Sequence, residues 1–85
     1  MITSAQLRAA RALLGVDQKT LADMAGVSLP TIQRMESSSG NVRGVVDTLM
    51  KVVSALDRAG IELIYDNARS ESGGRGVRLK EPPEG

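Results

Sequence analysis

The chain of 85 residues contains no cysteine and no histidine. Without cysteine, no disulfide and no thiolate metal site can supplement the small core that this length allows. Without histidine, the commonest general base and the commonest metal ligand are both missing. The GGRG stretch is too short for a phosphate-binding loop and lacks the strand and helix that flank one. We therefore expect a single domain that is not an enzyme and that needs no metal and no cofactor.

Aromatic side chains and long apolar runs are also scarce. One tyrosine is the whole aromatic content, so the stacking platforms that proteins use for single strands or RNA are missing. No apolar run approaches the ~20 residues of a membrane span, and no signal-peptide apolar region is present at the N-terminus. The chain is expected to be soluble and cytoplasmic, with no membrane contact and no evident small-molecule ligand.

The chain has almost no excess of charge of either sign, because its formal net charge is only +1. Residues 1–60 carry seven basic and five acidic side chains, whereas residues 61–85 carry four and five. A nucleic-acid function must therefore depend on the placement of a few arginines, such as Arg34 and Arg43, and not on a broad basic surface.

The most informative stretch that is present is residues 17–36, DQKTLADMAGVSLPTIQRME. Asp17 is placed to cap a first helix, and Gly26 supplies the permissive backbone for a sharp exit from it. The inward positions of that helix are predicted to be Leu21, Ala22 and Ala25.

A second helix follows directly. Ser28 is placed as its cap, and Pro30 falls in its first turn, where a missing backbone N–H is tolerated. Ile32 and Met35 are three residues apart and form one apolar face, which leaves the outer face polar. Two short helices that meet at a steep angle, one with a free polar face, predict a helix-turn-helix.

Helices are predicted on both sides of this motif. Thr3 and Gln6 form a capping box, and Ile2 and Leu7 have the spacing of a hydrophobic staple. The inner stripe of the first helix is predicted to be Leu7, Ala10 and Leu14, with Gly15 after its end. Residues 42–46 suggest an irregular helical turn. Asp47 is predicted to cap a helix over 48–59, whose apolar side is Leu49, Val52, Val53 and Leu56.

The periodicity changes after Gly60. Residues 61–65 and 76–80 are rich in strand formers and predict a β-hairpin with a long connection of glycine, serine and charged residues. Since an isolated two-stranded ribbon is marginal, its exposed edge suggests pairing with a second copy across a two-fold axis. The alternative is a frayed tail, which is the expectation for residues 81–85.

The order of residue types in 17–36 resembles the lambda Cro/C1-type helix-turn-helix regulators, the XRE family. The matching points are Gln18, the Leu21-Ala22 pair, Gly26-Val27 at the turn, and Ile32 with Arg34-Met35-Glu36, and the likeness extends over roughly residues 3–59. The fold class expected is mainly α, a compact bundle of four to five short helices that contains a helix-turn-helix, with a C-terminal β-hairpin. The expected organisation is a DNA-binding domain at 1–60, a hairpin that serves dimerisation at 61–80 and a disordered tail at 81–85.

The resemblance also implies which residues contact DNA. Residues of the second motif helix face the bases in this family, and here these are Ser28, Leu29, Pro30, Gln33 and Arg34. Arg34 is the strongest candidate, because a guanidinium can bind guanine O6 and N7 together, whereas Gln33 suits adenine. Leu29 and Pro30 offer only apolar contact, where better-known phage members carry more polar groups. The alternative for Gln33 and Arg34 is an ordinary solvated helix face.

Other residues are implied to have phosphate-contacting or structural roles. Gln18 stands at a helix N-terminus, which attracts anions, and its counterpart in the family commonly bonds a phosphate. Further phosphate candidates, each of which is as readily a plain surface residue, are Lys19, Thr31, Ser37, Asn41 and Arg43. Arg11 and Glu36 are implied to form a structural ion pair between the first and third helices, whereas Arg8 reaches a phosphate or nothing.

The function that the resemblance implies is transcription regulation by a DNA-binding protein of the repressor type found in bacteria and phages. It would act as a homodimer on double-stranded DNA with an inverted repeat, whose half-sites lie ~34 Å apart. Candidate dimer contacts are Val52, Val53, Leu63 and Tyr65. The alternative is an interaction module of the same fold, an antagonist or antitoxin-like protein that captures another regulatory protein.

Overall fold

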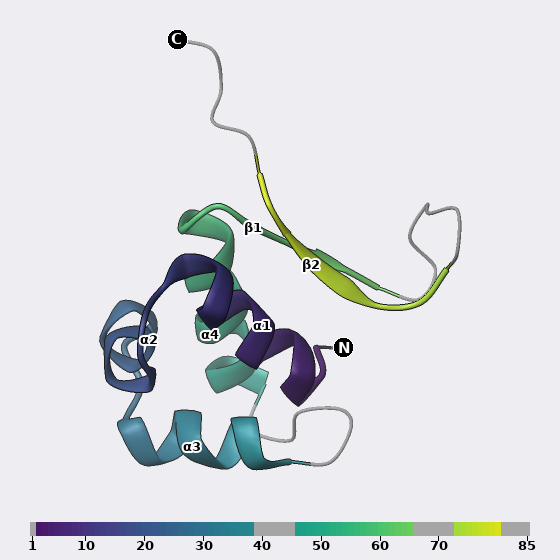
Figure 1. Ribbon diagram of the computed structural model, residues 1–85. Coiled ribbons are helices and arrows are strands. Elements are labelled where there is room, and N and C mark those ends of the chain that lie inside the picture. Colours follow the sequence, from purple (N-terminus) through teal and green to yellow (C-terminus); the bar gives the residue numbers. More distant parts are fainter. Residues whose placement is uncertain (1, 39–45, 66–72, 81–85) are drawn as a thin grey trace, which may run out of the picture.

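The computed structural model describes residues 2–38, 46–65 and 73–80 (Figure 1). In chain order its elements are α1 (Ser4–Leu14), α2 (Gln18–Ala25), α3 (Leu29–Ser37), α4 (Val46–Arg58), β1 (Ile61–Ile64) and β2 (Gly76–Leu79). The prediction of a mainly α bundle with a C-terminal hairpin is confirmed. The helical turn predicted at 42–46 lies, apart from Val46, outside the described residues. No helix in the described ranges is long and apolar enough to cross a membrane.

Local signals set the ends of the first helix. The Thr3 side chain accepts a hydrogen bond from the Gln6 backbone N–H at 3.1 Å, and the Gln6 side chain accepts one from the Thr3 backbone N–H at 2.9 Å. This reciprocal pair is the predicted capping box, and it satisfies donors that the first turn leaves without helical partners. Gly15 ends the helix at φ +69°, a left-handed conformation that favours glycine.

The helix-turn-helix is built from the predicted caps. Asp17 accepts from the Thr20 N–H at 2.8 Å, and Ser28 accepts from the Thr31 N–H at 3.3 Å. Between the two helices Gly26 has φ +68°, which a residue with a Cβ rarely adopts. The chain can therefore turn sharply and pack α2 against α3.

The cap of α2 makes one contribution to stability depend on pH. The hydrogen bond from Thr20 lowers the pKa of Asp17 below its ordinary value in the folded chain. A lowered folded pKa stabilises the fold above the unfolded value of ~3.9, and this contribution is lost as the pH falls through the folded value. Asp17→Asn keeps an acceptor oxygen at the cap but has no charge to lose. We therefore expect the stability of this variant to fall less than that of wild type as the pH decreases below about 4. Thermal melts between neutral and acid pH measure this, with Asp23→Asn as the matched control; an unchanged acid profile for Asp17→Asn would contradict it.

Helix α4 turns its predicted apolar side, Leu49, Val52, Val53 and Leu56, to the core, but it differs from the prediction at its start. It begins at Val46, so Asp47 lies inside the first turn and is not the cap; an acidic residue suits either position because the helix dipole favours negative charge there. Val52 is fully buried, whereas Val53 is partly buried. Val52 was predicted as a dimer contact and is instead a core residue, because Val52 shares its face with Ala55 and Leu56, which pack into the bundle.

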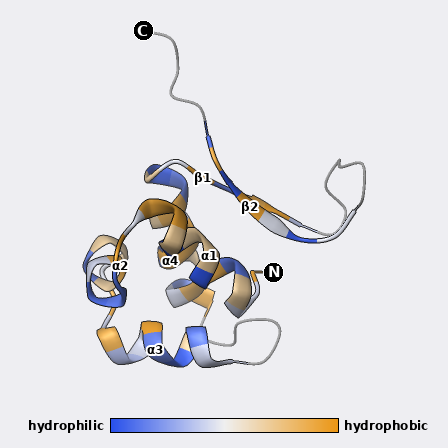
Figure 2. Ribbon diagram, in the orientation of Figure 1, coloured by the Kyte–Doolittle hydropathy of each residue, from blue (hydrophilic) through white to orange (hydrophobic). Residues whose placement is uncertain are grey.

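One core holds all these elements together. Its largest fully buried side chains are Leu7, Leu21, Ile32, Val52, Leu56 and Ile61. Figure 2 shows the hydrophobic parts of α1 and α4 gathered at the centre of the bundle. Since Ile61 is only 2% exposed and belongs to this core, the hairpin is anchored to the helices by its first strand residue.

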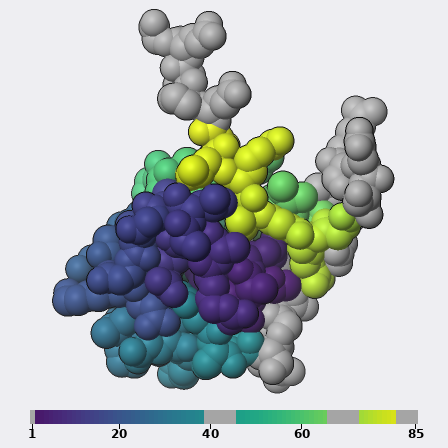
Figure 3. Space-filling view, in the orientation of Figure 1, coloured from purple at the N-terminus to yellow at the C-terminus, as the bar shows by residue number. Residues whose placement is uncertain are grey.

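The hairpin lies across the bundle on the side opposite α3 (Figure 3). Its strands pair antiparallel with Ile61 opposite Leu79 and Leu63 opposite Val77. Strand β2 packs on α1 and strand β1 packs on α4. On the outer face Glu62 lies opposite Arg78, and their side chains form an ion pair at 2.6 Å. The arrangement leaves α3 clear of the hairpin.

Candidate nucleic-acid interface

Helix α3 presents one face to the core and another to solvent. Ile32, Met35 and Glu36 are buried, at i, i+3 and i+4. Pro30, Gln33 and Arg34 are exposed, and Leu29 and Thr31 are half-buried. Ser28, exposed at the cap, completes the outward surface at the N-terminal end of the helix. The residues predicted to contact bases therefore run along the accessible side of α3, with Ser28 at the cap, Leu29 and Pro30 in the first turn, Gln33 in the middle and Arg34 in the last turn.

The polar side chains on this surface contact one another. The Ser28 and Thr31 hydroxyls lie 2.8 Å apart, and Arg34 Nη2 lies 3.4 Å from Thr31 Oγ1. The Arg34 contact is long and exposed, so the guanidinium keeps most of its donors available. Thr31, predicted to contact a phosphate, lies between the cap and Arg34 on this same surface.

The inward face of α3 ends in a hydrogen-bonded ion pair. Arg11 Nε donates to Glu36 Oε2 at 2.9 Å, and Arg11 Nη2 donates to Glu36 Oε1 at 3.0 Å. The Glu36 side chain is 4% exposed and that of Arg11 is 26% exposed. The hydrogen bond to Glu36 raises the pKa of Arg11 above its already high ordinary value, so the guanidinium stays charged. This bidentate contact joins α1 to α3 and fixes the rotation of α3 about its own axis.

Two more residues converge on the C-terminal end of α3. Gln18 Nε2 donates to Glu36 Oε1 at 3.2 Å, so the side chain predicted to contact a phosphate also orients the ion pair. Arg8 Nη1 donates to the Glu36 backbone carbonyl. From the sequence, Arg8 was expected to reach a phosphate or to have no partner. It instead binds a carbonyl that lacks a helical partner at the end of α3, where a cation is favoured.

The remaining phosphate candidates are more dispersed. Lys19 is exposed and pairs with Asp23 one turn along α2 at 3.3 Å, a contact that is weak in water. Ser37 is exposed, and its hydroxyl donates to the Arg34 carbonyl at 3.0 Å. Asn41 and Arg43 lie outside the described residues. No group of three or more acidic side chains that could hold a metal ion occurs in the ranges that the structure describes.

Sequence reasoning missed the polar contacts of three side chains that hold the helices and the hairpin together. Ser4 Oγ donates to the Ser38 carbonyl at 2.7 Å and so links the start of α1 to the end of α3. Arg58 Nη2 reaches the Met24 carbonyl near the end of α2 at 3.5 Å. Gln6 Nε2 donates to the Ile64 and Gly76 carbonyls at 2.9 and 3.0 Å and so ties the hairpin to α1. The only sequence signal for any of them was the capping-box position of Gln6.

These features define a DNA-binding helix-turn-helix: two short helices locked by a glycine turn, and a second helix with a free N-terminal end. A family model described as helix-turn-helix matches residues 7–62, about two thirds of the chain. The chain belongs to this Cro/C1-type, or XRE, family, as its sequence predicted. It is therefore a DNA-binding regulatory domain, of a family that is not typically enzymatic. No curated protein matches the chain as a relative.

Proposed function

We propose that the chain is a sequence-specific transcriptional regulator that binds an inverted-repeat operator as a homodimer, with α3 in the major groove. The observation that carries this proposal is the division of α3 into a buried face with Ile32 and Met35 and an exposed face with Gln33 and Arg34. A recognition helix needs this division, because the bundle must hold one side while the other side enters the groove.

Sequence readout is assigned mainly to Arg34. Its guanidinium makes one long hydrogen bond and no ion pair among those of the described residues, so its donors are free to bind guanine O6 and N7. Gln33, also exposed, would bind adenine N6 and N7. Leu29 and Pro30 are assigned apolar contact with a thymine methyl. Ser28, at the helix cap, would bond to either a base or a phosphate.

Phosphate contacts are assigned to the start of α2 and to both ends of α3. Gln18 stands at the N-terminus of α2, where backbone N–H groups and the helix dipole attract an anion. Lys19, Thr31 and Ser37 extend this surface. Two of the arginines near α3, Arg8 and Arg11, are already engaged with Glu36, so we expect a modest salt dependence of binding.

A homodimer suits the size of the chain. The molecule extends 35 × 33 × 21 Å. Elements related by a two-fold axis lie apart by twice their distance from it, so a molecule of this size can hold each α3 helix at the ~17 Å from the axis that a spacing of ~34 Å between successive major grooves requires. The two α3 helices would then read two half-sites of a symmetric operator.

Replacement of Arg34 by alanine tests the readout. We expect Arg34→Ala to weaken binding to promoter DNA from the gene's own neighbourhood by about 1–3 kcal/mol per half-site, which is about 5- to 150-fold. Fluorescence anisotropy with labelled duplexes measures the dissociation constant. The loss should be largest on the best sequence and small on random DNA, because a base contact discriminates and a phosphate contact does not.

Arg78→Ala is the matched control. It removes the same charge from an exposed side chain on β2, outside the helix-turn-helix, and should leave DNA affinity nearly unchanged. Equal losses for the two variants would show that charge alone matters and would refute base readout by Arg34. If wild type binds no neighbourhood DNA even at low salt, the alternative of an antagonist that captures another regulator becomes the better account, and a pull-down would follow.

A further inference from the structure

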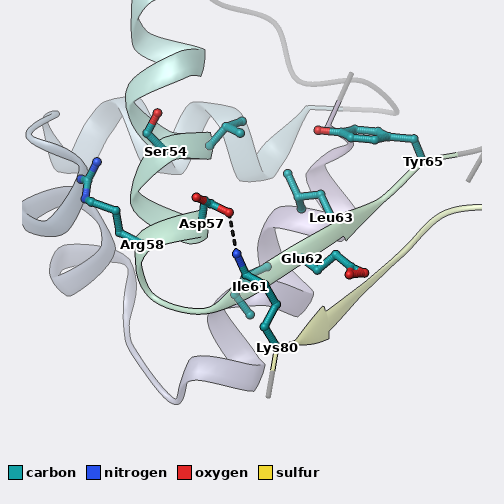
Figure 4. A pocket seen from close by; sticks show the side chains of 9 residues that line it. Ser54, Asp57, Arg58, Ile61, Glu62, Leu63, Tyr65 and Lys80 are labelled. Atoms are coloured by element: carbon teal, nitrogen blue, oxygen red, sulfur yellow. Dashed lines mark hydrogen bonds and ion pairs between the residues drawn. The ribbon is translucent and has the colours of Figure 1, made fainter. Parts of the chain in front are cut away.

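A groove runs between the second half of α4 and strand β1, away from the DNA-facing helix (Figure 4). Val53, Ser54 and Asp57 line it from α4, and Leu63 of β1 and Tyr65, the residue after β1, line it from the other side. A second, more apolar groove shares Val53, Ser54 and Tyr65 with the first and continues to Leu49 and Met50. Met50 is 61% exposed at the end of this second groove. This face of α4 and β1 is uncovered among the residues that the structure describes.

The groove also runs along the outer edge of β1, which pairs with no strand other than β2 among the described residues. The Lys80 N–H donates to the Gly60 carbonyl at 2.6 Å, which makes these two residues a hydrogen-bonded pair. Because hydrogen-bonded and non-hydrogen-bonded pairs alternate in an antiparallel ladder, Glu62 and Ile64 turn their backbone groups toward β2. Ile61 and Leu63 turn theirs away from β2, toward the groove. A strand edge of this kind accepts a further strand.

We propose that a second copy of this chain fills the groove by pairing its own β1 antiparallel with β1, which forms a four-stranded sheet over the two α4 helices. This proposal rests on the proposed homodimer and assigns it a surface. The contact is isologous, since the same edge and the same face of α4 are contributed by both copies. Side chains of residues 61, 63 and 65 share one face of the strand, and Ile61 shows that this face is directed to the core.

Glu62, the one charged side chain of β1, disfavours one register of this pairing. A two-fold axis at Leu63 sets Leu63 against the partner's Leu63 and Ile61 against the partner's Tyr65. These are apolar and aromatic cross-strand pairs of the kind that stabilise sheets. Glu62 then lies opposite the partner's Ile64. An axis at Glu62 would instead set two carboxylates directly opposite each other, which destabilises a sheet.

The absence of cysteine gives a direct test of the register. In the proposed pair the two Leu63 Cα atoms would lie ~5.5 Å apart, within the range that a disulfide spans. Leu63→Cys should therefore form a covalent dimer under mild oxidation, with no background from other thiols. Leu79→Cys is the control. Leu79 is 46% exposed on the other strand, and the Leu79→Cys variant should remain monomeric on a non-reducing gel.

A second variant tests the groove without disturbing the core. Ser54 is exposed on α4, so Ser54→Arg should fold normally, since arginine is a good helix former. Its bulk and charge would obstruct the partner strand, and we expect the dimer dissociation constant from sedimentation equilibrium to rise at least about tenfold. Ala9→Arg, the same kind of change at an exposed position of α1, should leave that constant unchanged.

The outcomes separate this proposal from the proposed function. Cross-linking of Leu63→Cys alone, together with dissociation of Ser54→Arg, supports the docking surface even if no DNA is bound. A wild-type dimer that binds DNA, does not cross-link through residue 63 and is unaffected by Ser54→Arg overturns the docking surface and leaves the DNA-binding proposal intact. A chain that stays monomeric at high concentration also overturns it.

Discussion

Replacement of Arg11 by alanine is expected to lower the free energy of unfolding by about 3–5 kcal/mol. The reason is the burial of Glu36, whose side chain is 4% exposed and accepts two hydrogen bonds from Arg11. After the replacement the carboxylate keeps, among the described residues, only the Gln18 donor at 3.2 Å. A charge left in the interior with one weak partner is costly, and the loss is a large part of the ~5–15 kcal/mol that stabilises a domain. Urea denaturation followed by circular dichroism measures it.

The reciprocal change should be milder. Glu36→Ala leaves Arg11, whose side chain is 26% exposed, free to turn toward water, so a smaller loss of stability is expected than for Arg11→Ala. The double variant Arg11→Met with Glu36→Leu replaces the pair by apolar groups and should recover most of the stability, because neither charge is then left without its partner. A double-mutant cycle isolates the coupling. Strictly additive effects would show that the ion pair does not join α1 and α3 in the way the geometry indicates.

The ends of the first three helices could be predicted from the sequence because their determinants are local. Thr3, Asp17 and Ser28 each accept from a backbone N–H three residues ahead, and Gly15 and Gly26 follow the last turn of their helices. Cap chemistry therefore acts within a few residues and leaves a readable pattern. The outward side of α3 followed equally from the apolar spacing of the helix.

Long-range features could not be predicted in the same way. Neighbouring valines at 52 and 53 point about 100° apart on a helix, and only the rotation of α4 in the bundle decides that Val52 is the buried one. Arg8 binds a carbonyl 28 residues away, and Gln6 binds carbonyls 58 and 70 residues away. Such contacts depend on how whole elements pack, for which the sequence near the residue carries no signal.

Gln6 is the second position where we expect a large effect, because one side chain serves two purposes. Its Oε1 accepts from the Thr3 N–H and closes the capping box of α1. Its Nε2 donates to the Ile64 and Gly76 carbonyls at the outer end of the hairpin. The residue is 3% exposed. Gln6→Leu would leave the buried Thr3 N–H without its acceptor and take one donor from the two part-buried carbonyls, which keep their strand partners, at about 1–3 kcal/mol for the buried group left unsatisfied.

Gln6→Glu separates the two purposes and makes the effect depend on pH. A glutamate can still accept from Thr3, but as a carboxylate it sets a negative charge against two carbonyl oxygens and offers no donor. Its neutral form can donate one hydrogen bond to a carbonyl, so the folded state favours protonation and raises the pKa of the introduced group. A raised folded pKa of an acid means that the variant is destabilised above that pKa and recovers as the pH falls toward the unfolded value of ~4.3.

The expected result is a Gln6→Glu variant that is less stable than Gln6→Leu at neutral pH and that gains stability relative to it as the pH falls toward the unfolded value of ~4.3. Thermal melts across that pH interval measure the difference in stability between the two variants. Amide hydrogen exchange at Ile64 and Gly76 shows whether the hairpin opens before the helices do. Glu62→Gln, a change of charge on the exposed face of β1, controls for general electrostatics. Parallel pH profiles for Gln6→Glu and Gln6→Leu would rule out the donation from Gln6 to the two hairpin carbonyls as a source of stability. If Gln6 has both roles, it connects α1, whose Arg8 and Arg11 bind Glu36 of α3, to β1, whose outer edge we assign to the second copy.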